Sequence, residues 1–150
     1  MIRKTFTLVS VLAISVFLLC GCGKDEDKDN SKSKTTLLTQ SDWVRTSLMI
    51  TINTNPPYDD HQNSAPCQRD NRWVFRTNGS YELNEGPTKC NAADPQIIQT
   101  GSWLFSDNET KLTIGSSTFT VDQLTETTMV LTYTYSGGGN TTITKGTYVH

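Results

Sequence analysis

The densest group of side chains able to do chemistry is the run Asp59-Asp60-His61. Carboxylates and imidazoles are ligands for metal ions such as zinc, and the same residue types act as general acids and bases. Three consecutive loop residues point in different directions, however, and the surrounding segment 53–66 is rich in Asn and Pro. We therefore expect a solvated loop here and no metal site.

The remaining residues suited to catalysis are scattered along the chain. His150 is the only other histidine, and neither histidine belongs to a recognisable nucleophile or metal motif. Paired carboxylates for glycoside hydrolysis would have to converge across a cleft, whereas Glu82, Glu85 and Asp94 fall near turns or strand ends, where solvated acids are common. The sequence thus predicts no enzyme, no catalytic residue and no cofactor. An enzyme would require His61 to meet two carboxylates in a pocket.

The cysteines at the N-terminal end of the chain give a clearer signal. Basic residues precede an uncharged run at 6–19, which is too short to span a bilayer, and Cys20 and Cys22 follow. The segment resembles a bacterial lipoprotein signal, whose cleavage requires a small residue before the cysteine that receives the lipid. Because Gly21 precedes Cys22, we expect a signal peptide at 1–21 and a lipid on Cys22. The alternative is an ordinary secreted protein with a spare cysteine.

Residues 22–36 are polar throughout, which predicts a disordered tether. A lysine followed by three acids, at 24–27, resembles the export signal of surface-exposed lipoproteins of the Bacteroidetes type. That resemblance implies a protein in the outer membrane, attached to it through its lipid alone and facing the cell exterior. The alternative is a solvated spacer and nothing more.

Composition after the tether excludes one class of partner and indicates the fold class. From residue 37 onward, seven Lys and Arg residues face eleven Asp and Glu residues, a formal charge of -4. Without a basic stripe, nucleic acid is not an expected partner. Thr and short runs of Val, Ile, Phe, Tyr and Trp dominate this part, which is typical of an all-β protein. Only 37–42 fits a single helical turn.

Eight segments are strand candidates, and alternation within 128–135 and in pairs such as Trp103 and Phe105 is typical of strands with one inner face. The eight segments are 43–53, 72–77, 80–84, 97–105, 110–114, 118–123, 128–135 and 141–149. Short turn sequences such as Asn78-Gly79 join most of them, which favours consecutive antiparallel pairing. Such a meander closes into a barrel without a crossing connection, and closure removes exposed edges. We expect residues 37–150 to form an eight-stranded antiparallel up-and-down β-barrel.

The second hairpin can be predicted to the residue. A two-residue turn at Asn78-Gly79 would place both aromatic residues of the preceding strand opposite polar residues. A three-residue loop with Gly79 left-handed instead places Phe75 opposite Tyr81 and Trp73 opposite Leu83, which is the better register. Extending the same ladder brings Cys67 and Cys90 within one residue of facing each other, so we expect a disulfide between them.

Several motifs together resemble the lipocalin-like domain of Bacteroidetes lipoproteins. They are CQRDNRWVF at 67–75, NGSY at 78–81, EGPTKC at 85–90, GSW at 101–103 and LTI at 112–114. The resemblance covers most of residues 37–150 and implies a lipocalin-like eight-stranded barrel with a cysteine pair. It implies no particular ligand. True lipocalins open with Gly-x-Trp, whereas this chain has Ser41-Asp42-Trp43.

The interior of an eight-stranded barrel is either filled by its own side chains or holds one small ligand. The residues expected to line it are Trp73, Phe75, Tyr81, Trp103, Met129 and Tyr133. We expect a monomer that binds a small apolar or amphipathic molecule in or at the mouth of the barrel, with segment 54–69 as lid or rim. The alternative is a protein-interaction or inhibitor module with a filled core, acting through loops such as Pro56-Pro57-Tyr58.

Overall fold

The computed structural model describes residues 32–150 of the chain. The expected signal peptide at 1–21, the expected lipid acceptor Cys22 and the first part of the expected tether, 22–31, lie outside the described residues. None of the helices within 32–150 has the length and apolar character needed to cross a membrane.

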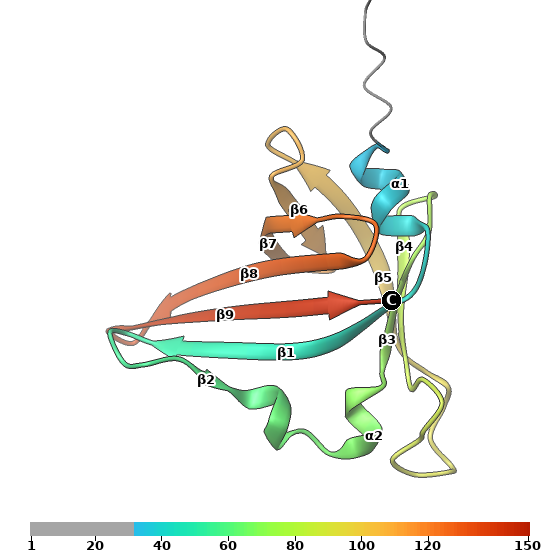
Figure 1. Ribbon diagram of the computed structural model, residues 1–150, viewed down its shortest axis with the longest axis horizontal. Coiled ribbons are helices and arrows are strands. Elements are labelled where there is room, and N and C mark those ends of the chain that lie inside the picture. Colours follow the sequence, from blue (N-terminus) through green and yellow to red (C-terminus); the bar gives the residue numbers. More distant parts are fainter. Residues whose placement is uncertain (1–31) are drawn as a thin grey trace, which may run out of the picture. The chain divides into compact units, whose positions relative to one another are not determined.

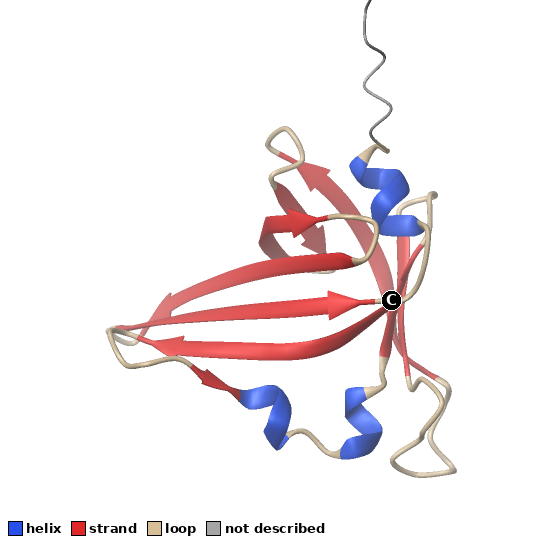
Figure 2. Cartoon of the chain, viewed as in Figure 1, coloured by secondary structure: helices blue, strands red, loops and turns tan. Residues whose placement is uncertain are grey.

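Nine strands and three short helical segments make up the described part of the chain (Figures 1 and 2). In chain order they are α1 (Lys34–Thr39), β1 (Trp43–Ile52), β2 (Tyr58–Asp59), the 3-10 helix η1 (Asp60–Asn63), α2 (Pro66–Arg69), β3 (Arg72–Phe75), β4 (Ser80–Asn84), β5 (Ile97–Ser106), β6 (Lys111–Ile114), β7 (Ser117–Leu124), β8 (Thr128–Gly137) and β9 (Asn140–Val149). All eight predicted strands are present, within a few residues of their predicted ends.

The strands form a closed, eight-stranded, antiparallel up-and-down barrel, which confirms the predicted fold class. Strands β3 to β9 are neighbours in sequence order, and β1 closes the barrel by pairing with β9 along almost its whole length and with β3 at its first two residues. Figure 1 shows β8, β9 and β1 side by side. The two-residue strand β2 adds to the other edge of β1, where Tyr58 pairs with Ile50. The sequence pattern did not predict β2.

The β3–β4 hairpin has the predicted register. Phe75 faces Tyr81 and Trp73 faces Leu83. Gly79 has a φ of +82°, and its N–H donates to the carbonyl of Arg76 at 3.0 Å, which closes the three-residue loop. The predicted disulfide between Cys67 and Cys90 is also present, and it ties α2 to the connection between β4 and β5. The predicted β3–β4 register therefore also gave the correct cysteine pair outside the hairpin.

Side chains of the barrel's strands, together with Leu38 of α1, form a buried cluster in its interior. The buried cluster consists of Leu38, Trp43, Phe75, Tyr81, Trp103, Leu112, Ile114, Met129 and Leu131. Four of the six predicted lining residues belong to this cluster, and Trp73 packs against it. Tyr133 does not belong to it; its ring is half-buried and lies 5.5 Å from the ring of Phe119. The middle of the barrel is therefore a core.

Tyr81 shows how closely this core is filled. Its ring lies against Gly101, the residue opposite it on β5, where a Cβ atom would come within 2.7 Å of the ring. Its hydroxyl accepts a hydrogen bond from Gln99 Nε2 at 2.7 Å. A glycine at an inner position thus makes room for a neighbouring aromatic ring, and the buried hydroxyl has the partner that burial requires.

Helix α1 packs onto the core through Leu38. The Leu38 side chain is fully buried, and its carbonyl accepts a hydrogen bond from Trp43 Nε1 at 2.9 Å. The helix begins at Lys34, inside the segment expected to be a disordered tether, so the expected tether ends too late by at least three residues. Two features account for the helix: Ser33 Oγ caps it by accepting from Thr36 N–H at 3.1 Å, and the buried Leu38 holds it against the barrel.

Candidate functional site

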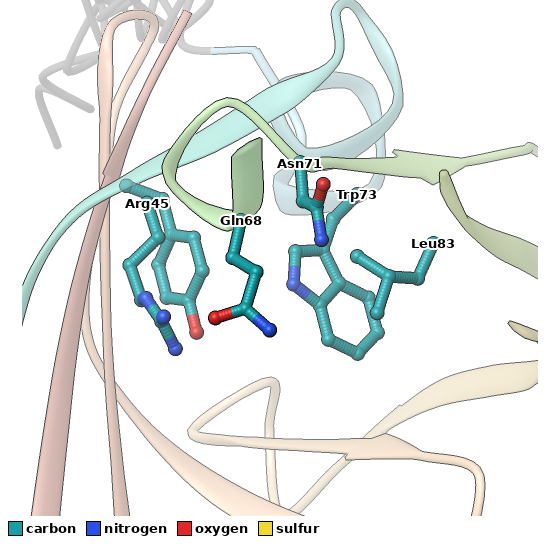
Figure 3. Close-up of a pocket in the computed structure, with 6 residues that line it drawn as sticks. Arg45, Gln68, Asn71, Trp73 and Leu83 are labelled. Carbon is teal, nitrogen blue, oxygen red and sulfur yellow. The ribbon is translucent and has the colours of Figure 1, made fainter. Parts of the chain in front are cut away.

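A pocket of about 310 Å³ lies between α2 and strands β1, β3, β4 and β9 (Figure 3). Its lining residues are Arg45, Gln68, Asn71, Trp73, Leu83 and Tyr148. Two cross-strand pairs form opposite walls: Arg45 with Tyr148 across β1 and β9, and Trp73 with Leu83 across β3 and β4. In Figure 3, Arg45 lies on one side, Trp73 and Leu83 lie on the other, and Gln68 lies between them. The pocket therefore has a polar wall and an apolar wall.

Tyr148 contributes a neutral hydroxyl to the polar wall. Its ring lies over Gly146, two residues earlier on β9, where a Cβ atom would come within 2.8 Å of the ring. Burial raises the pKa of the Tyr148 hydroxyl above its ordinary value, and the positive charge of Arg45 partly opposes that shift. Tyr148 consequently keeps its proton at neutral pH and can donate a hydrogen bond.

Arg45 is the only charged residue that lines the pocket. Arg45 Nε donates a hydrogen bond to His61 Nδ1, and Arg45 Nη2 donates one to Ser64 Oγ; both distances are 3.4 Å. Within residues 32–150 Arg45 has no carboxylate partner inside 4.0 Å. The ion pairs in this part of the chain are formed by Lys32, Arg72, Arg76 and Lys145. The guanidinium is thus held in place by two long hydrogen bonds to neutral groups.

His61 is buried, with only 7% of its surface exposed. Burial lowers the pKa of its imidazole below the ordinary 6.5, and the nearby charge of Arg45 lowers it further. A neutral imidazole has one free nitrogen acceptor, and Nδ1 has that role towards Arg45. The expectation of a solvated loop at Asp59-Asp60-His61 is therefore wrong.

Asp59 explains why this segment is ordered. Its Oδ1 accepts from the N–H groups of Leu48 and His61 at 3.0 Å each, and its Oδ2 accepts from Ser47 Oγ at 3.1 Å. The N–H of Leu48 is the main cause that lowers the pKa of Asp59 below its ordinary 3.8. The Asp59 carboxylate thus caps the N-terminus of η1 and also links η1 to β1. Across residues 32–150, no three His, Cys, Asp or Glu side chains converge as metal ligands would.

The other residues considered for chemistry lie apart from this arrangement. The ring of His150 lies 4.5 Å from the ring of Trp43. Glu82 pairs with Arg76 at 3.0 Å. Glu85 was expected to be a solvated acid but is only 8% exposed, and its N–H donates to the carbonyl of Gln96 at 2.9 Å.

Only one of the six predicted lining residues, Trp73, lines the pocket. Phe75, Tyr81, Trp103 and Met129 are core residues instead, and Tyr133 lies elsewhere on the inner face. The prediction selected aromatic residues and a methionine, whereas half of the pocket lining consists of the polar side chains of Arg45, Gln68 and Asn71. The sequence does contain a signal for Arg45: it is a charged residue two positions after Trp43, in phase with the inner face of β1.

A second hollow, of about 460 Å³, lies beside the link between α1 and β1. It is lined by Gln40, Ser41, Asp42, Val44, Arg72, Val149 and His150. Val44 pairs with both Arg72 and Val149, and it alternates with the inward residue Arg45. This hollow is therefore on the outer surface of the barrel.

Neither a protein-family model nor a curated protein matches this sequence. The resemblance to the lipocalin-like domain of Bacteroidetes lipoproteins stays a prediction. The case for a function consequently depends on the pocket and on the exposed surface of the barrel.

Proposed function

We propose that this protein is a lipocalin-like lipoprotein of the outer membrane surface that binds a small amphipathic molecule at the mouth of its barrel. The observation that carries the proposal is the pocket between α2 and the barrel, with Arg45 and Tyr148 on one wall and Trp73 and Leu83 on the other. A molecule with one polar end and one apolar end matches these two walls.

The size of the pocket limits the ligand. Pockets for small molecules begin at roughly 300 Å³, and this one measures about 310 Å³. The core cluster fills the interior beyond it, so a ligand would occupy the mouth and not the barrel axis. We therefore expect a small ligand that contacts α2, which belongs to the segment 54–69 predicted to be the lid or rim.

Mass spectrometry of native protein extracted from its own membrane tests this proposal. We expect a small molecule to co-purify with the unchanged protein and to be lost from Gln68→Trp, which fills the pocket from an exposed position on α2. Gln123→Trp on β7 is the matched control, because Gln123 is also exposed and does not line the pocket. Absence of a bound molecule from the unchanged protein, or equal retention by both variants, would contradict the proposal.

The lipid anchor is tested separately. Cys22→Ser should abolish labelling by a radioactive fatty acid and release the protein from membranes, since no other residue is proposed to carry lipid. Protease added to intact cells should remove the protein if it faces the exterior. A Cys22→Ser variant that stays labelled, or a protein that survives while known surface proteins are digested, would contradict this part of the proposal.

A second candidate function is a protein-interaction module. It is favoured by an exposed apolar strip near the C-terminal ends of β1 and β8. We define the strip as Ile52, Tyr58 and Tyr135. Ile52 and Tyr135 both pair with Thr142 of β9, and Tyr58 pairs with Ile50, so the three side chains share one face. Tyr135 is 58% exposed and Tyr58 is 47% exposed. Such a strip on a barrel with a filled core fits a protein partner.

A photo-crosslinking amino acid at position 135 tests the second candidate in intact cells. Position 104 on β5 is the matched control, because Leu104 is also an exposed apolar residue but lies outside the strip. A protein adduct formed from position 135 and not from position 104 would support the candidate. Identical adducts from both positions, or none from position 135, would count against it.

A further inference from the structure

Arg45 brings unused hydrogen-bonding capacity to the pocket. A guanidinium has five N–H donors in a planar fork. The two bonds to His61 and Ser64 engage two of these donors, and both are long, at 3.4 Å. At least three N–H groups of Arg45 therefore have no hydrogen-bond acceptor within residues 32–150. A partly enclosed guanidinium in this state is a ready site for an anion.

No carboxylate lines the pocket or pairs with Arg45 within residues 32–150. The other five lining residues are two amides, an indole, an aliphatic side chain and a phenol whose raised pKa keeps it neutral. The adjacent His61 is neutral because burial lowers its pKa. The carboxylates of Asp59 and Glu85 do not line the pocket. The pocket therefore presents one positive charge and no negative one.

Tyr148 adds a second donor beside the guanidinium. Arg45 and Tyr148 are directly paired across β1 and β9, so both side chains stand on the same face. Directly paired residues have Cβ atoms about 5 Å apart, which lets a guanidinium and a phenol reach the same small group. A planar carboxylate, with two oxygens that accept several hydrogen bonds, matches this pair of donors.

We infer that the ligand of this pocket is a small carboxylic acid with an apolar body, its carboxylate bound by Arg45 and Tyr148 and its apolar part against Trp73 and Leu83. The inference rests on the proposed binding function and adds the charge and class of the ligand. In Figure 3 the amide of Gln68 lies between the two ends of such a molecule, and the amide of Asn71 lies beside Trp73.

Calorimetric titration with three probes of equal chain length tests the inference. The probes are octanoate, 1-octanol and octylamine, and the protein is the mature chain from residue 22 with Cys22→Ser, which contains every described residue and needs no detergent. We expect octanoate to bind more tightly than octanol and octylamine not to bind. Arg45→Gln should weaken octanoate binding by roughly tenfold or more, the usual effect of losing a charged hydrogen bond, and should remove the preference over octanol.

Further variants separate recognition from folding. Tyr148→Phe should weaken octanoate binding several-fold with little change for octanol, because only one hydroxyl is lost. Arg45→Lys should restore part of the octanoate preference, since a lysine supplies the charge without the planar fork. Arg76→Gln, at a half-exposed site that pairs with Glu82, should bind as the unchanged protein does. Near-ultraviolet circular dichroism confirms that each variant retains its tertiary structure.

The possible results distinguish the inference from the proposed function. Equal binding of octanoate and octanol, or tighter binding of octylamine, would overturn the carboxylate inference and leave an amphipathic ligand standing. An undiminished octanoate preference in folded Arg45→Gln would also overturn it. Failure of all three probes to bind would contradict both the inference and the proposed function.

Discussion

At the scale of single residues, glycines decide where aromatic rings can lie. Gly101 lies beneath the ring of Tyr81, and Gly146 lies beneath the ring of Tyr148. In both cases a Cβ atom would come within 3 Å of the ring. The first arrangement fills the core, whereas the second turns a hydroxyl into the pocket. The same local device therefore serves packing at one place and a binding surface at the other.

His61 should make the stability of the fold depend on pH. Its pKa is below 6.5 in the folded protein because of burial, so the unfolded chain takes up a proton at higher pH than the folded chain does. The free energy of unfolding should therefore fall as pH drops below about 6.5, until the lowered folded-state pKa is passed. Urea denaturation at about pH 7.5 and about pH 5 measures this loss.

His61→Asn is the variant that isolates this effect. Asparagine retains an oxygen acceptor towards Arg45 but has no proton to gain in this range. We expect it to lose less stability than the unchanged protein between the two pH values. The lowered pKa of Asp59 does not interfere, because its stabilising contribution is lost only below its ordinary value of 3.8. Equal losses in both proteins would contradict the buried, neutral state of His61.

The residue-level predictions from sequence succeeded where a ladder constrained them. Trp73, Leu83 and the Cys67–Cys90 pair follow from one register, and all of them lie where that register requires. The pocket was mostly missed, because alternation shows which face a residue occupies and not whether neighbouring side chains fill the space in front of it. Arg45 shares the inner face of β1 with Trp43, but the absence of a carboxylate beside it depends on contacts between residues far apart in the sequence.

At the scale of elements, α1 is a helix that its own sequence cannot stabilise. Six residues are far fewer than an isolated helix needs in water. The helix is held by the burial of Leu38 and by Lys34 Nζ, which donates to the carbonyl of Glu109 at 2.7 Å. It therefore depends on the barrel, and its contacts with the barrel can be tested.

Leu38→Ala should destabilise the protein by about 2–5 kcal/mol, the usual cost of emptying a fully buried leucine site. Leu37→Ala is the matched control, because Leu37 is in the same helix and only half-buried. We expect its cost to be clearly smaller. Chemical denaturation of both variants provides the comparison. Similar losses for the two leucines would show that α1 does not pack on the barrel as described.

The predicted elements are correct where apolar runs are bounded by turn residues and incomplete where such runs are absent. All eight barrel strands were predicted from apolar runs bounded by turn residues, and all eight are present. The segment 54–69 has no such run, so β2, η1 and α2 were not predicted. The order of that segment comes from Asp59, whose carboxylate accepts the N–H of Leu48 on the edge of β1 that β3 leaves free. The Asp59 side chain thus accepts a backbone N–H of β1 that a neighbouring strand would otherwise accept.

At the scale of the whole molecule, the disulfide links the pocket to the barrel. Cys67 precedes Gln68 of the pocket directly, and Cys90 lies 23 residues further along the chain. Replacing both cysteines with serine should lower the free energy of unfolding by about 3 kcal/mol in the chain-entropy description of such a loop. The barrel should persist, because no strand depends on the bond.

Denaturation with and without a reducing agent measures this contribution. The reductant should destabilise the unchanged protein and leave the double serine variant unaffected, which controls for its effects on the rest of the chain. Octanoate binding should weaken in the double variant, since α2 loses its covalent link to the β4–β5 connection. A reductant effect of equal size in both proteins would contradict the assignment of the stability to this bond.

The seam between β1 and β9 also constrains when the protein can fold. The two strands are separated by nearly the whole folded chain, yet residues 44–52 of one pair with 142–149 of the other. Contacts between residues so far apart in sequence form slowly, because a long loop must close before any of them is gained. A nascent chain lacking its final strand has an unclosed wall with exposed edges. Strand β9 must therefore be synthesised before the barrel can close, and loss of β9 would be as damaging as loss of β1.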